Sequence, residues 1–101
     1  MQVSFETDKT VLTAKISGEL DHHVAKELRE KIDLKLAGGI YNTLIFDFGN
    51  LSFMDSSGIA VIVGRAENLK VLSGVVKVIN CDERIKKMLT LSGVAEYVEF
   101  I

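Results

Sequence analysis

Two hydrophobic periods alternate along this chain, and that alternation limits the folds open to it more than any other feature. Over 3–7 and 11–17, apolar residues recur at every second position, which predicts two half-buried strands joined by a turn. Over 22–37, the period changes to four, which predicts an amphipathic helix that stops at Gly38-Gly39. The residues that carry this longer period are Val24, Leu28, Ile32 and Leu36.

The same alternation continues to the end of the chain. The apolar run 44–48 predicts a strand at the centre of the sheet, buried on both faces, followed by a loop from Gly49 to Met54. A helix is expected over 57–71, with Arg65 off its apolar face and with Gly64 inside it, which suggests close backbone packing at that glycine. A strand over 75–79, a helix over 83–91 capped by Gly93, and a strand over 97–100 complete the pattern.

The order ββαβαβαβ predicts an α/β fold in which helices pack on one mixed sheet. Strands that are joined through a helix run parallel, whereas the N-terminal hairpin is antiparallel. With 101 residues, of which 48% are hydrophobic, we expect a single domain over 1–101.

Composition and missing motifs exclude several function classes. The net charge is −2 and no basic run stands out, so nucleic acid is a poor candidate partner. The longest apolar run, 59–63, is far shorter than a membrane span, and residues 1–10 do not resemble a signal peptide. A single cysteine, Cys81, allows no internal disulfide and fits a reducing cytoplasm. No GxGxxG, P-loop, HExxH or CxxC motif is present, so we expect no cofactor and no metal.

The segment 51–58 is the first candidate site, because it joins the end of a buried strand to the start of a helix. In α/β domains this carboxyl edge of the sheet commonly carries the functional groups. Asp55, Ser56 and Ser57 are also preferred residues for capping a helix N-terminus, so spacing alone leaves simple capping and a functional role both open.

The segment 18–23 opens the first predicted helix in the same way, with Asp21 as the expected cap. Adjacent residues such as His22 and His23 do not share one side of a helix, so a metal site built from this pair is not expected. We expect two solvent-exposed rings. Cys81 follows a strand without a histidine nearby in the sequence and is treated as an ordinary small side chain.

Together, Gly18-Glu19-Leu20-Asp21-His22-His23 and Leu51-Ser52-Phe53-Met54-Asp55-Ser56-Ser57-Gly58 resemble the hallmark segments of the STAS family, and most closely those of its sporulation anti-sigma factor antagonists. The order of strands and helices fits that family from Val3 to Phe100. Members generally carry one more helix after the last strand, whereas this chain ends at Ile101; that departure concerns stability and oligomeric state more than the site.

The resemblance implies a regulatory function rather than an enzymatic one. In this family, a small domain binds a serine kinase that doubles as an anti-sigma factor and releases the sigma factor from it. The kinase inactivates the antagonist by phosphorylating one serine, and a serine phosphatase reverses this. The acceptor corresponds to Ser56. Asp55 and Asp21 would shape the acceptor loop and the docking face, and Ser57 with Gly58 would begin the helix.

Three alternatives deserve comparison with this interpretation. A serine hydrolase would need the leading glycine of GxSxG and an oriented histidine, which the segment 54–58 lacks. A receiver-like domain phosphorylated on Asp47 would need clustered acids for magnesium, and no adjacent acidic pair follows a strand. The third alternative is a STAS module of a stress-signalling or transporter complex, which the sequence ranks below the sporulation type.

Overall fold

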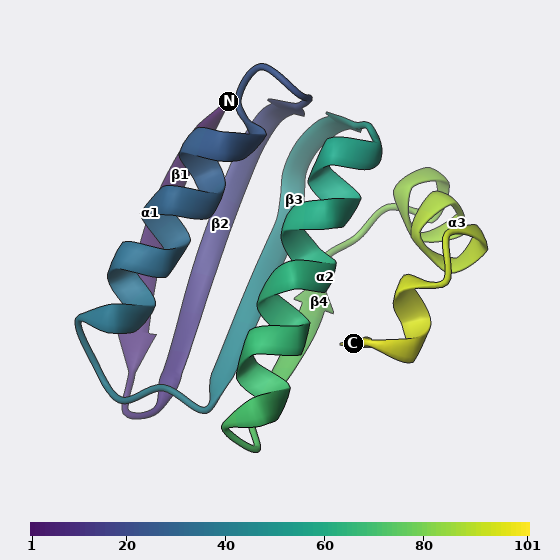
Figure 1. Cartoon of the computed structure of the whole chain (residues 1–101). Helices are drawn as coiled ribbons and strands as arrows, with labels where there is room; N and C mark the ends of the chain where they lie inside the picture. Colours follow the sequence, from purple (N-terminus) through teal and green to yellow (C-terminus); the bar gives the residue numbers. More distant parts are fainter.

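The computed structural model describes all 101 residues, as five strands, three α-helices and one short 3₁₀-helix (Figure 1). The chain order is the predicted ββαβαβαβ. In sequence the elements are β1 (Gln2–Asp8), β2 (Val11–Leu20), α1 (Ala25–Ala37), β3 (Thr43–Met54), α2 (Ser56–Val71), β4 (Val75–Ile79), α3 (Glu83–Leu91), η1 (Val94–Glu96) and β5 (Val98–Phe100).

The five strands form one sheet in the order β1-β2-β3-β4-β5. The β1–β2 pair is antiparallel, and every later neighbour is parallel, as predicted from the connections. Two of the helices, α1 and α2, lie side by side across one face of this sheet (Figure 1). The predicted α/β fold and the central position of β3 are therefore confirmed.

A single apolar core fills the space between the sheet and its helices. Strand residues that face the helices are almost completely buried: Leu12, Ala14 and Ile16 in β2, Leu44, Phe46 and Phe48 in β3, and Val76 and Val78 in β4. Their neighbours on the opposite face, such as Thr13, Ile45 and Lys77, are only partly buried. The prediction that β3 is buried on both faces is therefore wrong: its side chains alternate between core and a partly exposed face.

The predicted loop from Gly49 to Met54 is also wrong, because β3 continues without interruption to Met54. The second half of β3 pairs only with β2, which itself runs to Leu20 rather than ending at residue 17. The β2–β3 pairing shifts register twice, each time by one extra residue on β3. Gly18 of β2 lies between the two shifts with φ +85°, a left-handed conformation that glycine adopts most easily. Gly49 resembles a strand end because the neighbouring sequence does not show that β3 pairs with β2 beyond this residue.

The helices mostly match their predicted bounds. Gly93 follows α3 with φ +81°, as expected for a glycine after a helix C-terminus. Two expectations about α2 are wrong. A Cβ atom placed on Gly64 would meet nothing within 4 Å, so no close packing occurs there. Arg65 is buried against α1, where its Nε lies 3.0 Å from Asp33 Oδ1.

No helix is both long and apolar enough to cross a membrane.

Candidate functional site

Both candidate segments lie at the carboxyl edge of the parallel strands, where β2 and β3 end next to each other. Leu20 and Met54 are paired residues in the sheet, so the turns that follow them begin side by side. The Asp55 N–H donates to the Leu20 carbonyl at 3.2 Å, which extends the strand pairing into the turn. The sheet register thus brings together two motifs that are separated by 27 residues in the sequence.

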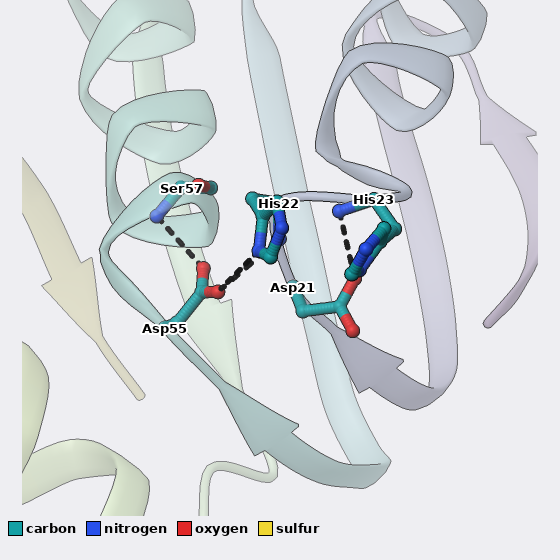
Figure 2. Close-up of polar contacts among 5 residues, drawn as sticks. All are labelled: Asp21, His22, His23, Asp55 and Ser57. Atoms are coloured by element: carbon teal, nitrogen blue, oxygen red, sulfur yellow. Dashed lines mark hydrogen bonds and ion pairs between the residues drawn. The ribbon is translucent and has the colours of Figure 1, made fainter.

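The Asp55 carboxylate connects the two turns (Figure 2). Its Oδ1 accepts a hydrogen bond from the Ser57 N–H at 2.8 Å, which makes Asp55 the N-cap of α2. Its Oδ2 accepts one from the His22 N–H at 3.1 Å. Desolvation of Asp55 opposes its ionisation, but the N–H groups of Ser57, His22 and Gly58 and the nearby His22 ring outweigh this and hold the pKa of Asp55 below its usual value.

Asp21 does not cap α1 as predicted. The helix begins at Ala25 and its N-cap, Val24, makes no side-chain cap bond. The Asp21 carboxylate instead accepts a hydrogen bond from the His23 N–H at 2.9 Å inside the turn, while the Asp21 carbonyl accepts from Ala25 at 3.0 Å. Asp21 therefore shapes the turn before the helix rather than the helix end itself.

His22 and His23 belong to this turn and not to a helix, so the geometric reason expected to separate them does not apply. Their ring centroids lie 3.9 Å apart, with the ring planes tilted by 37° (Figure 2). Each ring lies near a different carboxylate: His22 Nδ1 is 3.8 Å from Asp55 Oδ2 and His23 Nδ1 is 3.6 Å from Asp21 Oδ1. Both side chains are exposed, as predicted.

Ser56 and Ser57 have different surroundings although they are neighbours. Ser56 is the first residue of α2 and is exposed to solvent. Ser57 is half-buried, and its N–H is held by the Asp55 cap. Neither serine hydroxyl forms a hydrogen bond, so Ser57 does not show the backbone bond that its position suggested. Ser56 presents a free hydroxyl beside a helix N-terminus.

Gly58 fixes the first turn of α2 against the sheet. A Cβ atom at this position would lie 2.6 Å from Met54 Cγ and 3.0 Å from Leu20 Cδ2 and Cγ, closer than real side chains approach. Both neighbours are buried core residues. Only glycine therefore lets the helix start sit this close to the ends of β2 and β3.

The hydrolase and receiver-like alternatives depend on the groups around Ser56 and Asp47. His22 Nδ1 lies 3.8 Å from Asp55 Oδ2, and no hydrogen bond joins a histidine to a serine of the kind that a serine hydrolase uses. The receiver-like alternative needs acidic side chains clustered around Asp47. Asp47 lies roughly 20–26 Å before Asp55 along β3, and its carboxylate accepts hydrogen bonds from Gly49 and Asn80. No group of three metal-ligating side chains is present. Burial raises the pKa of Cys81 to about 11, which keeps its thiol protonated and unreactive near neutral pH.

Two further features of this region were not found from the sequence. Arg84, at the start of α3, donates through Nη2 to the Ser52 carbonyl at 2.8 Å, across 32 positions of sequence. Phe53, just before the turn, is 46% exposed. Phe53 belongs to the segment 51–58, but nothing in the neighbouring sequence indicates that α3 lies beside it.

The fold and these two turns define a class of small α/β domain, with one mixed sheet and two adjoining turns at the ends of β2 and β3. The STAS domain family model matches residues 2–101, so the chain belongs to the STAS domain family.

Similar proteins indicate the branch of the family. The chain is 33% identical over 97 residues to an anti-sigma F factor antagonist of Lysinibacillus sphaericus, covering 96% of this chain and 82% of that protein. It is 28% identical to an anti-sigma-B factor antagonist of Bacillus subtilis, covering 98% and 89%. Its structure resembles the anti-sigma factor antagonist SpoIIAA in its unphosphorylated form, with TM-score 0.86, 30% identity and coverage of 99% and 88%. Bacillus SpoIIAA in the phosphorylated form gives TM-score 0.78 at 30% identity, with coverage of 99% and 91%.

Proposed function

We propose that this chain is an anti-sigma factor antagonist whose activity is switched by phosphorylation of Ser56. The observation that carries the proposal is the free, exposed hydroxyl of Ser56 directly after the capping Asp55, at the start of α2. Support comes from the relatives that are named anti-sigma factor antagonists and from SpoIIAA, which has been solved in unphosphorylated and phosphorylated forms.

The N-terminus of α2 suits a phosphate. A helix of this length carries about half a positive charge at its start, together with unpaired N–H groups. The first turn of α2 contains no acidic residue, so only the cap Asp55 competes for those groups. Phosphorylation would take the net charge from −2 to about −4. Because Asp55 and not Ser56 caps the helix, this charge is added without removing a bond that the fold uses.

In this proposal the switch acts at a docking face formed by both turns. Asp21, Asp55, Ser57 and Gly58 shape that face, and the unphosphorylated form binds an anti-sigma factor serine kinase in the cytoplasm. The chain itself is not an enzyme; the kinase adds the phosphate and a serine phosphatase removes it. A phosphate that lost water at the interface without a cation opposite it would weaken binding by on the order of 2–5 kcal/mol, or roughly 30-fold to several-thousand-fold.

The first test locates the phosphate. The protein is incubated with the purified anti-sigma factor kinase of the same organism and ATP, and the modified peptide is identified by mass spectrometry. We expect phosphate on Ser56, none in Ser56→Ala, and reduced but clear transfer in the matched control Ser57→Ala. Phosphate on Ser57 of the wild type would overturn the assignment.

The second test separates a switch from a contact. We expect Ser56→Ala to bind the kinase like the unmodified protein and to release the sigma factor permanently. Ser56→Asp should bind at least about 30-fold more weakly, since it places a negative charge at the same point. If Ser56→Ala remained folded but lost kinase binding, the hydroxyl would be a binding contact and not the switch.

A second candidate function is a STAS module of a stress-signalling complex, favoured by the 28% identity to the anti-sigma-B factor antagonist. The two candidates differ in partner. Binding is measured to an anti-sigma F factor and to an anti-sigma-B factor. The higher identity to the sigma F antagonist favours preference for the first, and a preference for the second would select the alternative.

A further inference from the structure

A small apolar hollow lies between the end of β3 and α3. It adjoins the turn at Asp55 and Ser56, which we call the acceptor turn. Its volume is about 160 Å³, and we call its lining the Phe53 patch. The lining residues are Phe53, Met54, Arg84, Ile85 and Met88. Met54 and Ile85 form its buried floor, whereas Phe53 and Arg84 are exposed and Met88 is half-buried.

The Phe53 patch arises because α3 carries a second, mixed stripe beside the apolar stripe that faces the core. Ile85 and Leu89, four residues apart, join the protein core. Arg84, Met88 and Leu91 follow a second stripe at helical spacing, and Leu91 is 79% exposed. Met88 packs partly against the core, whereas Leu91 stays in contact with water.

A hydrogen bond holds together the two elements that line the hollow. The Arg84 Nη2 group donates to the Ser52 carbonyl at 2.8 Å, which holds the start of α3 against the last residues of β3. Phe53 is the next residue along that strand and is three positions from Ser56. The hollow and the acceptor hydroxyl are therefore held in a defined relation by neighbouring residues of one strand and turn.

We infer that the Phe53 patch is an anchor site for the kinase that phosphorylates Ser56, and that it takes an apolar side chain of that kinase. The inference rests on the proposed function, because it needs a kinase at Ser56. A specific protein interface buries about 800 Å² on each partner, so an enzyme centred on Ser56 must extend over residues adjoining the turn. On the Asp21 side it meets carboxylates and imidazoles, whereas on the α3 side it meets aromatic and methionine side chains, which are enriched among interface anchors.

Other exposed apolar residues do not share this position. Leu34 and Ile40 lie at or after the C-terminal end of α1, and Val71 and Leu72 lie at the C-terminal end of α2. Since α2 begins at the acceptor turn and is sixteen residues long, its far end is about 24 Å away. Leu34 lies near the C-terminal end of α1, is 75% exposed and does not line the hollow. It provides a matched control for loss of surface apolar area.

The experiment measures initial rates of phosphorylation over a range of antagonist concentrations. For Phe53→Ala we expect KM to rise at least about tenfold while kcat stays within about twofold, because the anchor contributes to docking and not to phosphate transfer. Phe53→Leu, which restores apolar bulk, should recover most of the loss, and Leu34→Ala should match the wild type. Circular dichroism and the urea midpoint establish that each variant is folded.

Three results would overturn the inference. An unchanged KM in Phe53→Ala, with the wild type phosphorylated at Ser56, would remove the anchor and leave the proposed function intact. A wild type that self-associates through this face, with the association lost in Phe53→Ala, would assign the hollow to a second copy of the chain. A wild type that the kinase does not phosphorylate at all would contradict the proposed function and the anchor together.

Discussion

Gly58 and Gly64 lie in the same helix, six residues apart, and the structure predicts that replacing them by alanine has opposite effects on stability. At Gly58 the new methyl group would lie 2.6 Å from Met54 Cγ and 3.0 Å from Leu20. Both are buried core side chains, and Leu20 has no exposed surface. At Gly64 the same methyl group would have no neighbour within 4 Å.

The magnitudes come from two competing effects. Alanine favours a helix interior over glycine by about 0.5–1 kcal/mol, and at Gly64 this effect acts alone. At Gly58 an extra methyl group in a packed core costs about 1–3 kcal/mol, which exceeds the helical gain. We therefore expect Gly64→Ala to stabilise the protein by about 0.5–1 kcal/mol and Gly58→Ala to destabilise it by up to about 2.5 kcal/mol.

Urea unfolding followed by circular dichroism measures both effects, and thermal unfolding provides a second readout. In a domain of this size 1 kcal/mol corresponds to about 4–8 °C in Tm. The two variants should therefore melt on opposite sides of the wild type. If Gly58→Ala were as stable as Gly64→Ala, then Met54 and Leu20 would yield freely and the account of the tight helix start would be refuted.

Two further predictions concern charged groups. The pKa of Asp55 is lowered in the folded state, so its stabilising effect is complete above the ordinary carboxyl value of 3.8 and is lost as pH falls through the lower folded value. Asp55→Asn should thus have a lower free energy of unfolding in urea than the wild type at pH 7, and this difference should shrink below pH 4. A difference that did not change with pH would contradict the prediction. Buried Arg65 forms no hydrogen bond through Nε or Nη1, so Arg65→Met should leave the free energy of unfolding nearly unchanged. Asp33→Asn leaves the guanidinium without its carboxylate and should lower the free energy of unfolding in urea by about 1–2 kcal/mol. The reverse order would refute the assignment of Asp33 as the compensating charge.

Local periodicity was sufficient to predict element order and strand direction, because each helix and strand of this chain carries its own amphipathic pattern. It failed where burial depends on a distant partner. The extension of β3 past Gly49 requires the end of β2 as its neighbour, and the burial of Arg65 requires α1. Neither contact leaves a trace in the adjacent sequence, so Gly49 resembles a strand end and Arg65 resembles a surface residue.

The candidate site divides in the same way. Asp55 as the N-cap of α2 follows from residue type and position, and the structure agrees. The expected cap of α1 by Asp21 fails because the chain makes a turn through His22 and His23 before the helix starts. The hydrogen bond from the His22 N–H to Asp55 could be found only in three dimensions, since it depends on the pairing of Leu20 with Met54.

The acceptor turn separates the residues that hold it from the residue that would be modified. Gly58 and Met54 fix the helix start against the core, and Asp55 uses both carboxylate oxygens on backbone N–H groups of two turns. Ser56 takes no part in either set of contacts. A phosphate on Ser56 would therefore change the charge of the surface without breaking a bond of the fold, and it would stand next to the Asp55 carboxylate that links the two turns. The two segments that resemble the family are thus coupled by one carboxylate, which is the physical basis of the proposed docking face that spans both.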